Sequence, residues 1–152
     1  MNYDIEIKTM EPIKVASMRY EGPVDKAGKY FPKIFRAIKG KANGAPFICY
    51  HKVDQKTGIA DLELCIPTSV TPNGKGISLK EIPPTKAVCL THIGSYDTLM
   101  MAYDAIRIYI ESNDLAEQVQ PPWREVFIKG PGLIFKGDAK KYITEIVFPI
   151  KD

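Results

Sequence analysis

The chain contains an internal repeat, and this repeat restricts the fold more than any single motif does. The stretches 8–16 and 80–88 align with two shared lysines and a shared proline, and the same offset places Gly22 on Gly94. Further along, Pro46-Phe47 aligns with Pro122-Trp123, and 62–67 aligns with 144–149. Such internal similarity indicates two copies of one structural unit that bury their apolar faces together. We therefore expect a single domain of two pseudo-symmetric halves, at about 1–72 and 73–152.

Each half has the pattern of a strand, a second strand that ends at a glycine, a helix and two more strands. Apolar residues between Val24 and Ile38 recur every three or four positions, which predicts a helix that ends near Gly40. In the second half, Ser95 is a candidate cap for a helix that ends near Asn113 and has an apolar face of Leu99, Tyr103, Ile106 and Ile110. The predicted fold class is α+β, with duplicated β-α-β-β units that form two antiparallel sheets, helices on one side and a central groove.

Composition argues against several classes of function. The chain has 152 residues, its apolar runs are too short to span a membrane, and its first residues lack the pattern of a secretion signal. A cytoplasmic protein without a membrane partner is therefore expected. The net charge is +3, but the lysines are dispersed, which argues against nucleic acid as a partner of this chain alone. We expect no cofactor, because no glycine-rich phosphate loop precedes a helix.

The cysteines and histidines do not form a metal or catalytic motif. Cys49, Cys65 and Cys89 are odd in number, lack Cys-x-x-Cys spacing and lie in apolar stretches, so buried free thiols are expected. Pairing of a cysteine with a histidine as a nucleophile has little support, since nothing nearby in the sequence would activate the thiol. His51 and His92 lie at strand ends without a second ligand at metal-site spacing. We expect no metal and two partly exposed structural histidines.

The residues that attract attention are glutamates within apolar strands. Strand alternation places Trp123, Glu125 and Phe127 on one face, and Glu145 lies in a closing strand that is apolar on both faces. Glu63 occupies the position matching Glu145 in the first half. A buried carboxylate either has a raised pKa or has a positive partner, and that partner is a cationic ligand or a lysine or arginine of a nearby strand. A third alternative is an edge position in water.

Aromatic residues are the second part of the predicted site. Ring faces attract delocalised cations and offer a large contact area. By strand face the best candidates are Trp123, Phe127 and Phe47, followed by Tyr20, Tyr50 and Tyr103, for which core packing is the alternative. The predicted ligand-binding set is therefore Glu145, Glu63, Trp123, Glu125, Phe127, Phe47, Tyr20, Tyr50 and Tyr103.

Four motifs occur in order along nearly the whole chain. They are an opening Ile-Glu-Ile-Lys followed by Pro-x-x-Val-Ala-x-x-Arg-Tyr-x-Gly-Pro-like spacing, the segment 91–97, Trp-Arg-Glu-Val-Phe-Ile at 123–128, and the strand that carries Glu145. In this order the sequence resembles the GyrI-like small-molecule-binding family, also called the AraC-type effector-binding domain. The resemblance implies a duplicated β-α-β-β fold and a groove in which a glutamate matching Glu145 and surrounding aromatics accept bulky cationic or amphipathic molecules. Phe127 stands where relatives commonly have tyrosine.

Three functions follow from these observations. The first is a stand-alone module that binds a small apolar, cationic or amphipathic xenobiotic. The second is a hydrolase of a reactive small-molecule toxin, with Glu145 or Glu125 as general base. The third is a protein inhibitor of the DNA gyrase type, with a protein partner. Relatives are often fused to a DNA-binding domain, whereas this sequence begins directly at its first strand, so regulation of transcription by this chain alone is not expected.

Overall fold

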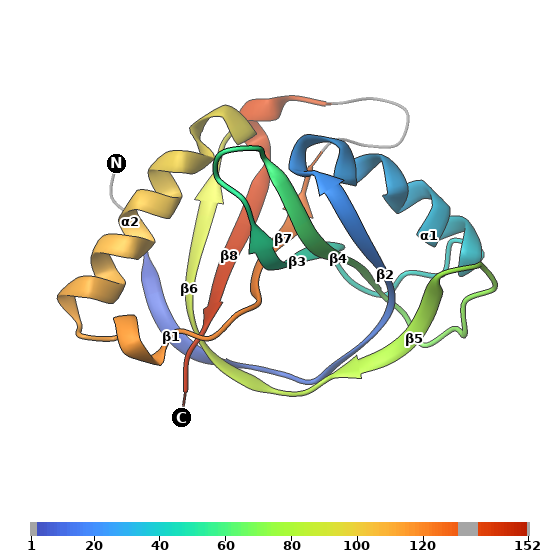
Figure 1. Cartoon of the computed structure of the whole chain (residues 1–152), viewed down its shortest axis with the longest axis horizontal. Coiled ribbons are helices and arrows are strands. Elements are labelled where there is room, and N and C mark those ends of the chain that lie inside the picture. The colour runs from blue at the N-terminus through green and yellow to red at the C-terminus, as the bar shows by residue number, and fades with distance from the viewer. Residues whose placement is uncertain (1–2, 131–136, 152) are drawn as a thin grey trace. The chain divides into compact units, whose positions relative to one another are not determined.

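The computed structural model describes residues 3–130 and 137–151, which form antiparallel strands and two α-helices of the α+β class (Figure 1). The described residues divide into two compact units, residues 11–84 and residues 3–10 with 85–151. These compact units are not the two sequence halves, because β5 (Ile77–Ile82) pairs with β2 (Ile13–Pro23) and β1 (Ile5–Met10) pairs with β6 (Thr85–Ile93). The opening strand of each sequence half thus lies in the other compact unit.

In the unit of residues 3–10 and 85–151, which we call unit A, the strand order is β1-β6-β8-β7. The strand β8 (Ile143–Pro149) pairs with both β6 and β7 (Trp123–Lys129). The short helices η2 (Tyr96–Thr98), η3 (Ala116–Gln118) and η4 (Ala139–Lys141) lie in the connections. Every strand pairing in this sheet is antiparallel, as predicted.

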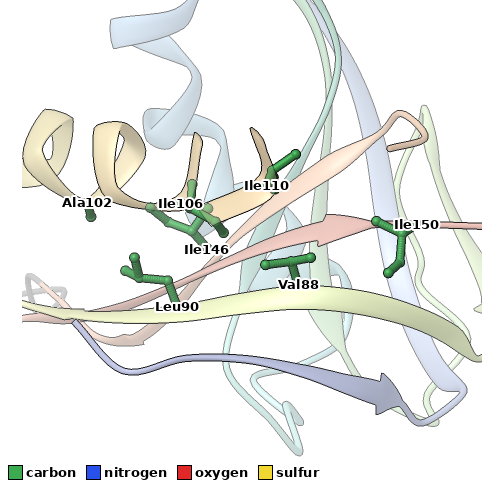
Figure 2. Close-up of a cluster of buried hydrophobic side chains, with 7 residues drawn as sticks. All are labelled: Val88, Leu90, Ala102, Ile106, Ile110, Ile146 and Ile150. Carbon is green, nitrogen blue, oxygen red and sulfur yellow. The ribbon is translucent and has the colours of Figure 1, made fainter. Parts of the chain in front are cut away.

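The helix α2 (Leu99–Ser112) covers one face of the unit A sheet. Its apolar side packs on β6 and β8 in a cluster made by Val88, Leu90, Ala102, Ile106, Ile110, Ile146 and Ile150 (Figure 2). The predicted face of Leu99, Tyr103, Ile106 and Ile110 is the face that contacts this cluster. The helix ends at Ser112, with Asn113 as its C-cap, which agrees with the expected end near Asn113. Ser95 precedes η2, but its side chain does not cap the helix. The position of α2 therefore identifies the face of the unit A sheet that carries Val88, Leu90 and Ile146.

In the unit of residues 11–84, which we call unit B, the strand order is β3-β4-β2-β5. The strand β4 (Ile59–Pro67) pairs with β2 and with β3 (Phe47–Val53), and both pairings are antiparallel. The predicted first helix is a 3-10 helix, η1 (Val24–Tyr30), followed by α1 (Phe31–Ala37). It ends where Gly40 adopts a φ of 71° and donates a backbone hydrogen bond to Phe35 O, as expected for a glycine that closes a helix.

No helix among the described residues is long and apolar enough to cross a membrane.

Candidate binding site

Glu145 lies on the face of the unit A sheet that is opposite α2. It shares this face with Val147 and Val126, which pack with Ala87 and Cys89, whereas its neighbour Ile146 packs under the helix. The residue is 9% exposed, and Lys8 Nζ donates a 2.8 Å hydrogen bond to Glu145 Oε2. From the sequence, the positive partner of this carboxylate was expected to be either a cationic ligand or a basic residue of a nearby strand. In the structure, Lys8 from β1 is such a partner.

A cavity of about 640 Å³ adjoins Glu145 on this face, lined by Tyr3, Asp4, Glu6, Cys89, Thr91, Ile93 and Glu145. Glu6 Oε1 also lies 3.8 Å from Lys8 Nζ, so one lysine serves two acids. Burial, followed by the negative charge of Glu145, raises the pKa of the Cys89 thiol to about 12. The thiol is therefore neutral at physiological pH, in agreement with the expected inert cysteine.

Glu63 has the same kind of partner in unit B. Its side chain is 5% exposed, and it forms an ion pair with Lys80 of β5 and a 3.1 Å contact with His51 Nε2. Burial by itself raises the pKa of Glu63, but hydrogen bonds from Lys80, His51 and Ser17 outweigh it and hold the pKa below its ordinary value. The two glutamates that align in the sequence thus form ion pairs with the two lysines that align, Lys8 and Lys80.

The α2 face of the unit A sheet carries the other predicted acid. Glu125 of β7 lies opposite Ile146 in the register, and Ile146 packs under α2. Glu125 is 8% exposed and accepts a hydrogen bond from the Tyr103 hydroxyl, which in turn accepts a 3.3 Å hydrogen bond from Trp123 Nε1. Glu125 and Glu145 therefore lie on opposite faces of one sheet.

Aromatic rings gather around Glu125 on this face. Trp123 stacks on Phe148 with ring centroids 5.9 Å apart and planes 6° from parallel, and Tyr103 meets Phe148 edge to face at 6.3 Å. Trp123, Tyr103 and Phe148 are all half-buried. We call these three residues the first aromatic group.

A second aromatic group lies further along β7 and β8. Tyr96 of η2 contacts Phe127 at a centroid distance of 6.1 Å and Tyr142 at 5.2 Å. Burial, then Tyr142 and the negative charge of Glu125, raises the pKa of the Tyr96 hydroxyl. Tyr96 is 40% exposed, which leaves the rim of this group accessible. The two groups lie at either side of Glu125 along the same face.

The predicted ligand-binding residues thus fall into separate sets. Trp123, Glu125, Phe127 and Tyr103 come together on the α2 face of unit A, while Glu145 lies on the opposite face of that sheet. The remaining four, Phe47, Tyr20, Tyr50 and Glu63, belong to unit B. There Tyr20 donates a hydrogen bond to Pro23 O and packs on Tyr30, and Phe47 and Tyr50 are buried.

Three residues of the two aromatic groups, Phe148, Tyr96 and Tyr142, were not among the predicted site residues. Each of the four ring contacts described on this face includes Phe148 or Tyr96, and Phe148 lies three positions after Glu145 on the same strand. Strand alternation therefore predicted that Phe148 and Glu145 point in opposite directions. It did not predict that Trp123 of β7 lies on the same face as Phe148. The register between two strands depends on how they pair, which the sequence of one strand does not determine.

His92 differs from the expectation of partial exposure. The side chain is fully buried, and its Nδ1 and Nε2 contact the Tyr3 hydroxyl at 2.9 Å and Thr98 Oγ1 at 3.0 Å. All three cysteines are buried and free, as predicted.

The family model that matches this chain is the GyrI-like small molecule binding domain, over residues 3–151, and the chain belongs to this family. No curated protein matches it at a significant level. The match to the family model confirms the resemblance that the four motifs indicated.

Among solved structures, the EcmrR C-terminal domain is similar with a TM-score of 0.82 and 28% identity, and the alignment covers 100% of this chain and 99% of that one. The chain in a cryo-EM structure of the EcmrR–DNA complex has a TM-score of 0.78 and 25% identity over 99% of this chain and 58% of that one. SAV2435 bound to tetraphenylphosphonium shares the fold, with a TM-score of 0.58 and 14% identity over 99% and 94% of the two chains.

Proposed function

We propose that this small-molecule-binding domain takes a small, apolar, cationic or amphipathic organic molecule, and that Glu125 receives the positive charge. The observation that carries the proposal is a buried carboxylate, hydrogen-bonded by a tyrosine hydroxyl, on a sheet face lined by aromatic rings. Burial makes a carboxylate costly to keep in its charged form. A ligand cation that enters here lowers this cost.

The aromatic groups supply the rest of the recognition. A delocalised cation gains from ring faces within roughly 6 Å, and more so when water is displaced. Trp123, Phe148 and Tyr103 are half-buried and are held by contacts with one another, which favours a preformed aromatic surface for a ligand. This arrangement favours bulky, flat or propeller-shaped cations over small ammonium ions. The tetraphenylphosphonium bound to SAV2435 belongs to that chemical class.

Glu145 is the alternative carboxylate that could receive the positive charge of the ligand, and the sequence analysis favoured it. The cavity beside it supports this alternative, because Asp4, Glu6 and Glu145 line the same space. Against it, Lys8 already supplies a positive charge at 2.8 Å, and a cationic ligand would have to compete with this ammonium group. The cavity lining also includes one aromatic residue, Tyr3, whereas rings lie on both sides of Glu125.

Titration with tetraphenylphosphonium tests the proposal. The chain has a single tryptophan, Trp123, which lies in the first aromatic group, so its fluorescence reports binding directly and calorimetry confirms the affinity. We expect Glu125→Gln to weaken binding at least tenfold, or about 1.4 kcal/mol. Glu117→Gln, on the exposed short helix η3, removes the same charge elsewhere and serves as the matched control.

A third variant separates the two acceptors. If Glu145→Gln weakens binding tenfold and Glu125→Gln does not, the charge is received on the opposite face and our assignment is wrong. Equal affinities in wild type and both variants would remove a role for either carboxylate.

The other expectations from the sequence stay predictions. They are the duplication of one unit, the central groove, hydrolysis with Glu125 or Glu145 as general base, inhibition of the DNA gyrase type and a cytoplasmic location. Turnover of a strained electrophile that is lost in Glu125→Gln would establish the hydrolase.

A further inference from the structure

Thr144 on β8 carries a buried hydroxyl that is unusual among the described residues. The residue is fully buried, and its Oγ1 has no hydrogen-bond partner in the parts of the chain that the structure describes. A buried polar atom without a partner costs free energy, and the hydrogen of a hydroxyl is the costlier half, because spare acceptor lone pairs are tolerated more often than orphaned donors. The Thr144 hydroxyl therefore lacks an acceptor.

The polar neighbour of Thr144 does not provide one. His92 lies directly opposite Thr144 in the β6–β8 register. Both of its ring nitrogens already have partners, since Nδ1 contacts the Tyr3 hydroxyl and Nε2 contacts Thr98 Oγ1 and Ser95 O. The ring is held in this position by residues from two different segments and does not turn toward Thr144 without losing these contacts.

Thr144 belongs to the face on which Glu125 lies. It stands opposite Phe127 in the β7–β8 register, and Glu125 stands opposite Ile146, so Thr144 and Glu125 are diagonal neighbours on two adjacent strands. Diagonal neighbours in an antiparallel pair are roughly 7–8 Å apart. Phe127 and Tyr142, members of the second aromatic group, flank the hydroxyl along the chain and across the strand pair.

The same register positions in unit B are apolar. Thr144 directly precedes Glu145, and the residue that directly precedes Glu63 in unit B is Leu62. Leu62 is fully buried. Ile48 stands opposite Leu64, the residue after Glu63, as Glu125 stands opposite Ile146, the residue after Glu145. Unit A thus has two polar side chains on a face where the equivalent positions of unit B hold isoleucine and leucine.

We propose that Thr144 is a specificity determinant of the ligand site, donating a hydrogen bond to an acceptor atom that the cation carries at the end away from its positive charge. This inference rests on the proposed function of Glu125 and narrows its ligand class. The ligand is an aromatic organic cation with a carbonyl or similar acceptor at one end. The charge lies at Glu125 and the acceptor at Thr144, with the second aromatic group around the acceptor end.

Two matched phosphonium ions test this inference. (4-Acetylphenyl)triphenylphosphonium carries a carbonyl acceptor, and (4-isopropylphenyl)triphenylphosphonium has nearly the same shape without one. We expect the wild-type protein to bind the acetyl compound about fivefold more tightly, the size of one hydrogen bond. Thr144→Val, which keeps the shape and removes the hydroxyl, should abolish this preference while leaving the affinity for the isopropyl compound within about twofold.

Two controls make the result decisive. Thr144→Ser retains the donor and should retain the preference, and thermal unfolding of each variant checks that the fold is intact. Equal affinities of the wild-type protein for the two compounds, or an unchanged preference in Thr144→Val, would overturn the role of Thr144.

The failure of the proposed function has a different signature. If Glu125→Gln binds both compounds as tightly as wild type, or if neither compound binds, the assignment of Glu125 and the inference built on it are both wrong. If Glu125→Gln weakens both compounds equally and Thr144→Val changes nothing, only the role of Thr144 is lost.

Discussion

The two compact units agree on one face of their sheets and differ on the other. Each has a buried glutamate in ion-pair contact with a lysine two strands away, Glu63 with Lys80 and Glu145 with Lys8. On the opposite face, unit B has Ile48 and Leu62 where unit A has Glu125 and Thr144. What the units share serves the fold, and what only one unit has is the better candidate for function.

The reason is energetic. A glutamate with a lysine partner in each unit is a repeated solution to one structural problem, the burial of a carboxylate. A threonine hydroxyl without a hydrogen-bond partner among the described residues, at a core position that holds leucine in unit B, lowers the stability of unit A relative to an apolar face. Local departures from packing rules of this kind are expected at binding sites.

The largest expected effect tests whether each unit has its own core. Ile106 under α2 in unit A and Ile34 of α1 in unit B are both fully buried. We expect Ile106→Ala and Ile34→Ala each to lower the free energy of unfolding by about 3 kcal/mol, because each leaves a cavity. Urea denaturation measures both. A loss below about 1 kcal/mol in one variant would show that its unit contributes little to the cooperative core.

The ion pairs come next in size and test the shared face. Lys80→Met and Lys8→Met each leave a buried carboxylate without its ammonium partner, and we expect a loss of about 1–2 kcal/mol, less than for a fully buried pair because both lysines are partly exposed. Lys80→Met should be the more harmful, since the Glu63 side chain is 5% exposed and that of Glu145 is 12% exposed. The reverse order in denaturant unfolding would contradict this account of the shared face.

The pH dependence of stability sharpens the comparison further. The folded-state pKa of Glu63 lies below the unfolded value of about 4.3, because the Lys80, His51 and Ser17 contacts outweigh burial. Its contribution to stability is therefore present above that unfolded value and is lost as the pH falls through the lower folded-state pKa. The difference in stability between wild type and Glu63→Gln should be constant near neutral pH and shrink in acid. A difference that grows on acidification would give the opposite sign for the pKa shift.

The smallest effect concerns the unmatched face. Thr144→Val removes a hydroxyl without a partner among the described residues, so we expect the unfolding free energy to rise by about 0.5–1 kcal/mol. Thr68→Val is the matched control, because Thr68 is equally buried but donates a 2.6 Å hydrogen bond to Lys41 O. That variant should be destabilised by about 1–2 kcal/mol. Similar losses in both variants would mean that Thr144 is hydrogen-bonded in solution.

Much of the fold was readable from the sequence, and the site only in part. The apolar spacing predicted α2, and a lysine of a nearby strand was one of the partners left open for Glu145. Strand alternation also separated Glu145 from Phe148 correctly. It did not relate β7 to β8, so Glu125 and Glu145 were assigned to one site although they lie on opposite faces. Pairing register depends on contacts between distant strands, which periodicity within one strand does not encode.

The alignment of the two sequence halves also had a limit. Pairing Pro46-Phe47 with Pro122-Trp123 placed Phe47 on Trp123 and Cys49 on Glu125. The strand registers instead match Ile48 with Glu125, a shift of one residue, because Ile48 and Glu125 face Leu64 and Ile146. In a strand, a shift of one residue moves a side chain to the other face. The contrast between the two units is therefore visible only in the structure.

A crystal structure of the protein with tetraphenylphosphonium tests the central claim most directly. Our account predicts that the phosphonium lies on the α2 face of unit A, with its charge within roughly 6 Å of the Glu125 carboxylate and its rings against Trp123 and Phe148. A phosphonium in the cavity beside Glu145, with Lys8 displaced from that carboxylate, would contradict the account.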